Sequence, residues 1–351
     1  MLERNGAVWA VGSNMFSQLG IDSESYKVTT NFVEVVPGGA LAVAAGSEHS
    51  MVLMQDDSVW LTGTNLFGQI GDGSNSGTRK FVKVIPDNAK AMAAGAKHSL
   101  VVMRDGSVWA TGSNLHGQLG DGSTTDRNKF SQVMPGGAKA VAAGSEHSMV
   151  LKEDGSVWVT GANWKGQLGA GRTGAKNIFM MVMPSGAKAI AAGTFHSMIL
   201  NEDGSVRATG ENNSGQLGDG TTASRSTFVQ VVAQGVLDIA AGYEHSVILR
   251  QFGSVWTAGR NNFGQLGAAK TMSSSIFVPV ISGGAKGVAA GDRHSMVLKR
   301  DGSLWGTGAN MYGQLGDGSM INKNTFERVA PARGGAWCTL GVSRIWMSYV
   351  Q

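Results

Sequence analysis

The sequence is poor in cysteine, in proline and in long apolar runs, and each shortage excludes a class of protein. Cys338 is the one cysteine among 351 residues, which excludes an internal disulfide framework and a zinc site built from cysteines. With 6 prolines against 52 glycines, the chain is neither collagen-like nor a proline-rich disordered tract. No apolar run approaches the roughly 20 residues of a membrane-spanning helix, so we expect no membrane span.

A secretion signal and a strong net charge are also lacking. The N-terminal stretch MLERNGAVWAVG has no apolar segment of the kind that directs secretion, and one cysteine fits a reducing compartment. The formal net charge of +4 is mild for this length and does not by itself indicate nucleic acid as a partner. We therefore expect an intracellular protein, in the cytoplasm or the nucleus.

What the sequence has in abundance is an internal repeat. The motif N-x-x-x-Q-[LI]-G occurs seven times, beginning at Asn14 and ending with the copy at Asn310. Histidine recurs every 49 residues, at His49, His98, His147, His196, His245 and His294. Tryptophan recurs in the same phase, at Trp9, Trp60, Trp109, Trp158, Trp256 and Trp305, with Arg207 in the remaining place. Seven repeats of about 49 residues account for residues 1–351 and predict a single domain.

Each repeat has the pattern of four short strands. In one copy, the small-residue run AVAAG precedes the apolar run HSMVL, and an Asp-Gly turn leads into SVWVTG. A glycine-rich loop, ANWKGQLGAG, then leads to an outer strand, FMMVMP. Four strands repeated seven times predict an all-β fold, a seven-bladed β-propeller of four-stranded blades.

The repeat is offset from the ends of the chain. The sequence begins with a third-strand pattern, GAVWAVG, and its last regular repeat ends with an outer-strand pattern, FERVAP. We therefore expect the ring to be closed by N- and C-terminal strands in the last blade, which removes an exposed sheet edge. The closing segment, Trp337–Gln351, departs from the repeat, and Arg344 stands near the place of a seventh histidine.

The motifs AAGxxHS, DGSVWxTG and NxxGQLGDG resemble the regulator of chromosome condensation repeat family, over essentially the whole chain. The resemblance implies a seven-bladed propeller but no single function. The family includes a chromatin-bound exchange factor for the Ran GTPase, a plant UV-B photoreceptor and many adaptor domains. The exchange factor carries a blade insertion, whereas the spacing from His49 to His294 is uniform. The photoreceptor places tryptophan before the repeated histidine, and no copy here does so.

The run Ser145-Glu146-His147 has residue types found in catalytic triads, but the repeat argues for a structural histidine. Neighbours along a strand point to opposite faces, and a catalytic site is normally singular, whereas this histidine occurs six times. The GQLGDGS segments lack both the G-K-[ST] of a phosphate loop and the several carboxylates of a calcium loop, so we interpret them as tight turns. We predict no catalytic, metal-binding or cofactor-binding residue, and no enzyme.

Candidate binding residues lie in loops that share one face of the predicted propeller. The inner loops carry acids, and Trp164 stands in a loop as a candidate exposed contact. The outer variable segments are basic, which predicts an acidic inner mouth with a basic rim diluted by aspartates. The acids are Glu48, Glu146 and Glu244, and the basic residues are Arg79, Lys80, Arg127, Lys129, Arg172 and Lys176. Neither face has a continuous basic stripe of the kind that nucleic acid favours.

These features predict a non-enzymatic, protein-binding propeller that acts as a scaffold, adaptor or subunit of a larger assembly. The partner is another protein, and no cofactor is expected. The alternative, which rests on the family resemblance, is a guanine-nucleotide exchange factor or chromatin-associated regulator with a small GTPase as partner. The sequence does not determine the oligomeric state.

Overall fold

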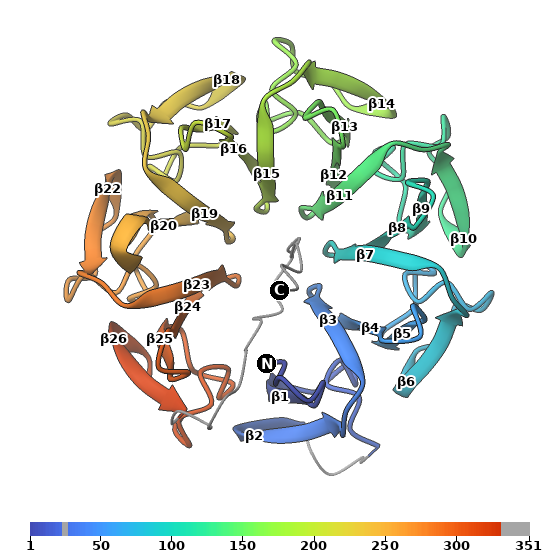
Figure 1. Ribbon diagram of the computed structural model, residues 1–351, viewed down its shortest axis with the longest axis horizontal. Helices are drawn as coiled ribbons and strands as arrows, with labels where there is room; N and C mark the ends of the chain where they lie inside the picture. Colours follow the sequence, from blue (N-terminus) through green and yellow to red (C-terminus); the bar gives the residue numbers. More distant parts are fainter. Residues whose placement is uncertain (23–26, 331–351) are drawn as a thin grey trace.

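The computed structural model describes residues 1–22 and 27–330, and these form strands apart from one short 3-10 turn, η1 (Gln251–Gly253). Six antiparallel sheets of four strands stand around a common centre, with a two-stranded sheet between the last and the first of them (Figure 1). The two-stranded sheet consists of β1 (Val8–Ser13) and β2 (Val28–Val36). Among the described residues, no helix is long and apolar enough to cross a membrane.

The strands of each complete blade follow one another in space as they do in sequence, from the centre outward. The first strands are β3 (Ala40–Ala45), β7 (Ala89–Ala94), β11 (Ala138–Ala143), β15 (Ala187–Ala192), β19 (Val236–Ala241) and β23 (Ala285–Ala290). The second strands are β4 (His49–Met54), β8 (His98–Met103), β12 (His147–Lys152), β16 (His196–Asn201), β20 (His245–Arg250) and β24 (His294–Lys299). The third strands are β5 (Val59–Gly63), β9 (Val108–Gly112), β13 (Val157–Gly161), β17 (Val206–Gly210), β21 (Val255–Gly259) and β25 (Leu304–Gly308). The outer strands are β6 (Thr78–Ile85), β10 (Arg127–Met134), β14 (Lys176–Met183), β18 (Arg225–Val232), β22 (Ser274–Ile281) and β26 (Lys323–Ala330).

The prediction of seven four-stranded blades is wrong, because the described residues form six such blades and the two-stranded sheet β1–β2. The N-terminal residues supply a third and an outer strand, as their sequence pattern indicates. The inner strands were expected from Trp337–Gln351, which lie outside the described residues and whose sequence lacks the small-residue strand and the repeated histidine. The predicted closure of the ring by strands from both ends of the chain depends on C-terminal residues that lie outside the described ones.

Local sequence determines the turns within a blade. In the hairpin between β8 and β9, the Asp105 carboxylate accepts a hydrogen bond from the Ser107 amide at 2.8 Å, and Gly106 has a φ of 79°. Glycine adopts this left-handed backbone without strain, so the Asp-Gly pair favours the turn. In the next blade, β12 pairs with β13 without interruption, from His147 opposite Gly161 to Leu151 opposite Val157.

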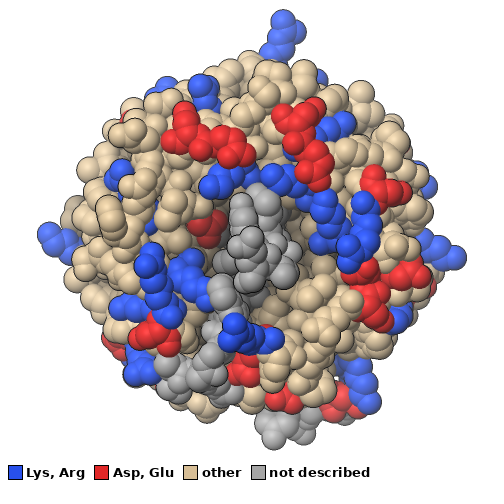
Figure 2. Space-filling model, in the orientation of Figure 1, with Lys and Arg blue, Asp and Glu red and all other residues tan. Residues whose placement is uncertain are grey.

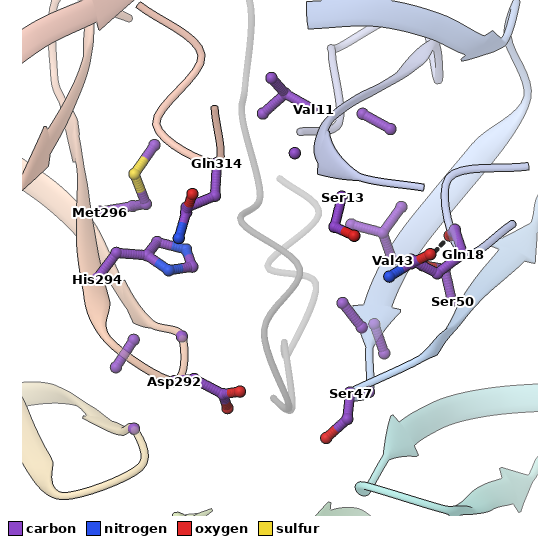
Figure 3. A pocket seen from close by; sticks show the side chains of 18 of the residues that line it. Val11, Ser13, Gln18, Val43, Ser47, Ser50, Asp292, His294, Met296 and Gln314 are labelled. Atoms are coloured by element: carbon purple, nitrogen blue, oxygen red, sulfur yellow. Dashed lines mark hydrogen bonds between the residues drawn. The ribbon is translucent and has the colours of Figure 1, made fainter. Parts of the chain in front are cut away.

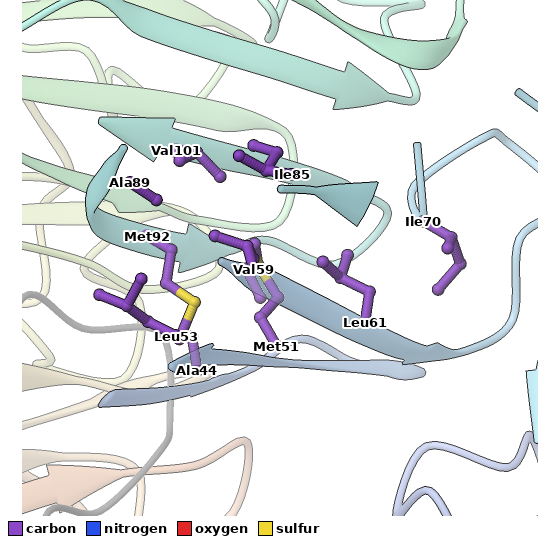
Figure 4. Close-up of a cluster of buried hydrophobic side chains, with 11 residues drawn as sticks. Ala44, Met51, Leu53, Val59, Leu61, Ile70, Ile85, Ala89, Met92 and Val101 are labelled. Atoms are coloured by element: carbon purple, nitrogen blue, oxygen red, sulfur yellow. The ribbon is translucent and has the colours of Figure 1, made fainter. Parts of the chain in front are cut away.

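The apolar core lies between neighbouring blades. One cluster joins Met51 and Leu61, on β4 and β5, to Met92 and Val101 of the next blade (Figure 4). Met51 and Leu61 are fully buried. Because each blade buries its sheet faces against its neighbours, the blades stabilise one another and hold the loops at their ends in a fixed arrangement.

A second contact joins the blades near the outer strands. Gly120 follows β9 and lies against the Phe179 ring of the next blade, where an added Cβ would approach the ring to 2.4 Å. The same contact joins Gly316 to Phe32 of β2, and Gly20 to Phe81 of β6. The two-stranded sheet is therefore held on both sides by the contact that joins complete blades.

The four strands of a blade place its loops at two opposite faces. We call the face with the Gly-x-x-His and N-x-x-x-Q loops the loop face, and the opposite one, with the tight hairpins, the hairpin face. The Gly-x-x-His loops join first strands to second strands, and the N-x-x-x-Q loops join third strands to outer strands.

Candidate functional site

The repeated histidines hold neighbouring blades together. His147 Nε2 lies 2.9 Å from the Ser197 hydroxyl of the next blade. That hydroxyl donates its one hydrogen to the Gln167 carbonyl at 2.7 Å, so the imidazole Nε2 carries a hydrogen and donates it to Ser197. The same arrangement joins five pairs of blades, through His49–Ser99, His98–Ser148, His147–Ser197, His196–Ser246 and His245–Ser295. We call these five contacts the histidine–serine junctions.

Burial keeps the junction histidines neutral. It lowers the pKa of His147 to about 3 and that of His49 to about 4, because charging an imidazole away from water costs free energy. The Nδ1 atom of His147 is buried with no hydrogen-bond partner among the described residues. Ser197 donates its hydrogen to a carbonyl and accepts one from His147. The imidazole is therefore not placed to take a proton from the serine, as the base of a nucleophile–base pair would be.

The glycine of the AAG motif makes room for the imidazole. A Cβ added at Gly144 would lie 2.2 Å from the Cε1 atom of His147 and 2.5 Å from the Gly193 carbonyl oxygen. The sequence Ala-Ala-Gly-x-x-His is thus one structural unit, in which the ring packs on a bare backbone. His147 bonds to Ser197 of the next blade, which supports the structural interpretation of Ser145-Glu146-His147.

The N-x-x-x-Q loops are held by their own side chains. Asn114 Oδ1 accepts a hydrogen bond from the Leu119 amide at 3.0 Å, and Gln118 Oε1 accepts one from the His116 amide at 3.0 Å. Asp121 Oδ1 accepts hydrogen bonds from the Ser123 amide at 2.9 Å and from Asn114 Nδ2 at 3.1 Å. These contacts make the tight turn that the sequence predicts. Within the described ranges, no three His, Cys, Asp or Glu side chains are grouped as a metal site would need.

An exposed apolar side chain follows the motif asparagine in five successive positions around the ring. We call these residues the apolar arc: Met311, Met15, Leu66, Leu115 and Trp164. Leu66 and Leu115 are 71% and 68% exposed, and Trp164 is 43% exposed. In the two remaining blades the same position holds Asn213 and Asn262. The loop face therefore has an apolar side and a polar side.

The residue after the arc position contacts the Gly-x-x-His loop of the next blade. Lys97 Nζ lies 4.6 Å from the centre of the Phe67 ring, and Arg293 lies 4.9 Å from that of Phe263. His116 Nε2 lies 3.7 Å from a Glu146 carboxylate oxygen. These contacts tie the rim loops to the inner loops and limit the motion of the arc.

Trp164 belongs to the apolar arc and also contacts a loop of the preceding blade. Its ring meets the edge of the His116 ring from the preceding blade, with centroids 4.6 Å apart and planes at 81°. This edge-to-face contact is of the kind that aromatic pairs favour. One part of the indole is thus supported while the other is exposed, and the role of Trp164 as a contact residue stays a prediction.

The three predicted acids lie in separate blades of the loop face. Glu146 stands beside His116, and Glu244 pairs with Arg260. Along the ring of inner loops, Glu48, Glu146 and Glu244 alternate with Lys97, Phe195 and Arg293. The structure therefore places the acids at intervals, with cations and one aromatic residue between them.

Five of the six predicted basic residues lie in outer strands, and this corrects the prediction that they belong to loops. Arg127 pairs with Gly112 and Lys176 with Gly161, because the outer strands extend past a β-bulge to the ends of the third strands. The residues in strands are Arg79, Lys80, Arg127, Lys129 and Lys176. Arg172 stays in a loop and is exposed.

Aspartates neutralise part of this basic set. Lys80 Nζ lies 2.7 Å from the Asp22 carboxylate, and an Arg127 guanidinium nitrogen lies 2.8 Å from that of Asp121. Figure 2 shows one face of the molecule, on which Lys and Arg side chains lie around the centre with Asp and Glu side chains among and outside them. Neither the basic nor the acidic side chains form a continuous band in this view.

Four members of the apolar arc are absent from the predicted site: Met15, Leu66, Leu115 and Met311. A signal was present, since each occupies the second position of the N-x-x-x-Q motif. An apolar residue inside a repeated loop is ordinarily part of the core, and sequence alone does not separate the two cases. The exposed fractions of these four side chains show that they lie at the surface and not in the core.

The chain has no match among curated protein sequences, but its fold is that of several solved structures. A crystal structure of Kap60 bound to yeast RCC1 (Prp20) aligns with a TM-score of 0.81 and 21% identity, over 92% of this chain and 83% of that chain. A structure of Prp20p from Saccharomyces cerevisiae, described with its binding to Gsp1p and histones, gives 0.79 and 21%, over 92% and 85%. Human WBSCR16 gives 0.83 and 18%, over 94% of each chain. Identities this low show a shared fold.

The family is shown by the sequence motifs. One model of the regulator of chromosome condensation (RCC1) repeat matches residues 41–69, 89–118, 138–167, 187–216, 236–265 and 285–314. A second model of the same repeat matches residues 105–151, 203–249 and 253–298. Each match of the first model covers the inner strands, the repeated histidine and most of the N-x-x-x-Q motif. The chain therefore belongs to the family of regulator of chromosome condensation (RCC1) repeat proteins.

Proposed function

We propose that this chain is a protein-binding propeller, which acts without catalysis as a scaffold, adaptor or subunit of an assembly inside the cell. The observation that carries the proposal is the apolar arc, because five successive ring positions expose Met, Leu or Trp at the same place on one face. Single exposed apolar residues are ordinary, whereas a repeated set on one face is typical of a surface that a partner covers.

The residue types of the arc fit a protein partner. Tryptophan and methionine are enriched at the centres of protein interfaces, and Trp164 is a candidate for a residue that contributes much of the binding energy. The contact with His116 holds its indole in place, so little side-chain freedom is lost on binding. Polar groups lie close by, among them Glu146 and the exposed Arg172, and these would orient the partner.

We propose a function without catalysis because of the histidine–serine junctions. The most reactive residue types in each repeat, His and Ser, are occupied in holding blades together at five places. Repetition of one neutral, buried pair supports a structural role.

The test compares the apolar and the polar sides of the loop face. Partners of the tagged chain are identified by mass spectrometry, and the affinity of a purified partner is then measured. We expect Leu66→Asp with Leu115→Asp to weaken that affinity at least tenfold, because two exposed apolar contacts become charged. The matched control, Asn213→Asp with Asn262→Asp, introduces the same charges on the polar side and should change the affinity less than threefold. Equal affinity in both double variants would contradict the proposal.

A second candidate function is regulation of a small GTPase. It is favoured by the fold shared with Prp20p, a protein described as binding Gsp1p and histones. The uniform repeat spacing from His49 to His294 argues against an inserted segment of the kind that the resemblance implies for exchange factors. A nucleotide-release assay with a panel of small GTPases tests it, and release at the intrinsic rate with every one of them would exclude it.

A further inference from the structure

The apolar arc changes in chemistry along its length. Leu66, Leu115 and Trp164 form one part, and Met15 and Met311 form the other. The two methionines occupy neighbouring positions of the ring, since the loop of Met311 belongs to the last complete blade and that of Met15 to the two-stranded sheet beside it (Figure 1). One part of the arc is therefore built on thioethers, which are flexible, polarizable and open to oxidation.

Both of these methionine side chains are in contact with solvent. Met15 is 53% exposed and Met311 is 48% exposed. Each is followed in the sequence by an exposed aromatic residue, Phe16 in one loop and Tyr312 in the other. Two adjacent loops thus present two thioethers and two aromatic rings on the same face, which makes this part of the arc rich in large apolar side chains.

The turns beneath the two methionines are held by other residues. The Leu19 amide donates to Asn14 Oδ1 at 3.0 Å, and the Leu315 amide donates to Asn310 Oδ1 at 2.9 Å. These bonds do not involve the thioether atoms. A chemical change at the sulfur of Met15 or Met311 should therefore alter the surface and leave the loop backbone in place.

Methionines in the core provide an internal comparison. Met51, Met149 and Met198 are fully buried between blades. Met296 lines a pocket together with His294 and is buried as well (Figure 3). An oxidant dissolved in water should therefore reach the sulfur atoms of Met15 and Met311 long before those of the core.

The reaction of an exposed methionine with hydrogen peroxide is an oxygen transfer. The thioether sulfur forms a bond to one peroxide oxygen, the O–O bond breaks, and proton transfer completes a sulfoxide and a molecule of water. The sulfur loses two electrons and the peroxide gains them. Methionine sulfoxide reductases reverse the change with a dithiol as reductant, one enzyme for each epimer of the sulfoxide.

We propose that Met15 and Met311 are modification sites at which hydrogen peroxide weakens binding of the partner to the arc, and at which reduction restores it. This inference rests on the proposed function, which assigns the arc to a protein partner. Oxidation converts a flexible apolar side chain into a polar one. Covering the new S–O group with an apolar partner surface costs free energy unless a hydrogen bond replaces the lost water.

The first test measures where the chain is oxidised. The full chain is treated with hydrogen peroxide, and sulfoxides are located by peptide mapping with mass spectrometry. We expect sulfoxide to form about tenfold faster, or more, at Met15 and Met311 than at Met51 and Met149, because exposure controls the reaction. Saturation with the purified partner should slow the reaction at Met15 and Met311. Equal rates at Met15, Met311 and Met51 would overturn the proposal.

The second test measures partner affinity before and after peroxide treatment. In the unaltered chain the affinity should fall about tenfold, and treatment with both sulfoxide reductases should restore it. In the double variant Met15→Leu with Met311→Leu, the ratio of the two affinities should stay close to one, since leucine is not oxidised. The matched control is Met181→Leu with Met272→Leu, which removes two exposed methionines outside the arc and should respond to peroxide as the unaltered chain does.

The outcomes separate this inference from the proposed function. If both sulfoxides form and the affinity is unchanged, while Leu66→Asp with Leu115→Asp still weakens binding, only the oxidation proposal is overturned. If neither the sulfoxides nor that double variant affects binding, the proposed function is contradicted as well. An equal loss after peroxide in Met15→Leu with Met311→Leu also overturns the inference, because the effect then arises elsewhere in the chain.

Discussion

The histidine–serine junctions and the apolar arc are built from the same repeat but differ in what they allow. At the junctions, five copies keep the same atoms at the same 2.9 Å separation. At the arc, the corresponding position holds Met, Leu, Trp or Asn, while the loop backbone around it keeps its hydrogen bonds. The difference shows where the fold constrains the sequence and where it leaves residues open for recognition.

The reason is the environment of each position. A junction imidazole has a bare glycine on one side and a serine hydroxyl at its tip, so no other side chain fits both. An arc side chain points into solvent, and the turn beneath it is held by Asn and Gln, so its identity hardly affects folding. Changes at the junctions should therefore affect stability, and changes at the rim should affect binding.

The largest expected effect is acid unfolding through the six repeated histidines. Unfolded histidine has a pKa near 6.5, whereas burial lowers the pKa of His98, His147 and His245 to about 3 and that of His49, His196 and His294 to about 4. The unfolded chain therefore binds more protons below pH 6.5, and stability falls as the pH falls from 6.5 towards 4. Each imidazole costs about 1.4 kcal/mol per pH unit in that window.

Denaturant unfolding at pH 8, 6.5, 5.5 and 5 measures this effect. Stability should be level between pH 8 and pH 6.5 and should then drop with a slope of several protons. Aspartates do not produce this drop, because the lowered pKa of Asp105 or Asp154 affects stability only below the ordinary value of 3.8. Unchanged stability at pH 5 would show that the histidines are not buried as neutral groups.

A smaller effect is expected from Gly144→Ala. The added Cβ would clash with the His147 ring and with the Gly193 carbonyl oxygen. Because the second of these atoms belongs to the backbone, moving it away costs free energy. We expect a loss of about 1–3 kcal/mol in the free energy of unfolding, as for overpacked sites in general. Gly136→Ala is the control, since its Cβ would come no closer than 3.6 Å to its nearest neighbour and its φ is not left-handed. It should be neutral or slightly stabilising, and equal losses in both variants would refute the role of the imidazole.

The smallest effect is expected at the rim, from Lys80→Ala. Its ion pair with Asp22 spans 2.7 Å, but the two side chains are 68% and 55% exposed. Exposed ion pairs contribute less than about 1 kcal/mol to the free energy of unfolding, so the thermal unfolding temperature should hardly change. High salt screens the pair and should make the change smaller still. A loss as large as that of Gly144→Ala would remove the contrast between the rim and the junctions.

The strand pattern of a blade could be predicted because it depends on local chemistry. Tight hairpin turns, alternating apolar residues and small residues in the first strand each have a direct structural meaning; all six complete blades form the hairpin, and four of them have Asp-Gly there. The number of complete blades could not be predicted by counting motifs. The N-terminal copy has a third and an outer strand only, and whether inner strands join them depends on contacts between distant parts of the chain.

The candidate site was predictable only in part. Trp164 was found because a tryptophan in a glycine-rich loop is conspicuous, while Leu66 and Leu115 look like core residues in the same pattern. The basic residues were found by charge, but five of them were assigned to loops because sequence does not show how far an outer strand extends.

The sequence by itself determined the blade, the spacing of its motifs and the structural nature of the repeated histidine, because these follow from turn chemistry and from repetition. Only the tertiary structure decided which serine each junction histidine contacts, which apolar loop residues face solvent, and that the described residues form six complete blades with one two-stranded sheet between the last and the first of them. Those outcomes depend on packing between segments that lie about 50 residues or more apart, and the pattern of a single segment carries no record of its neighbours.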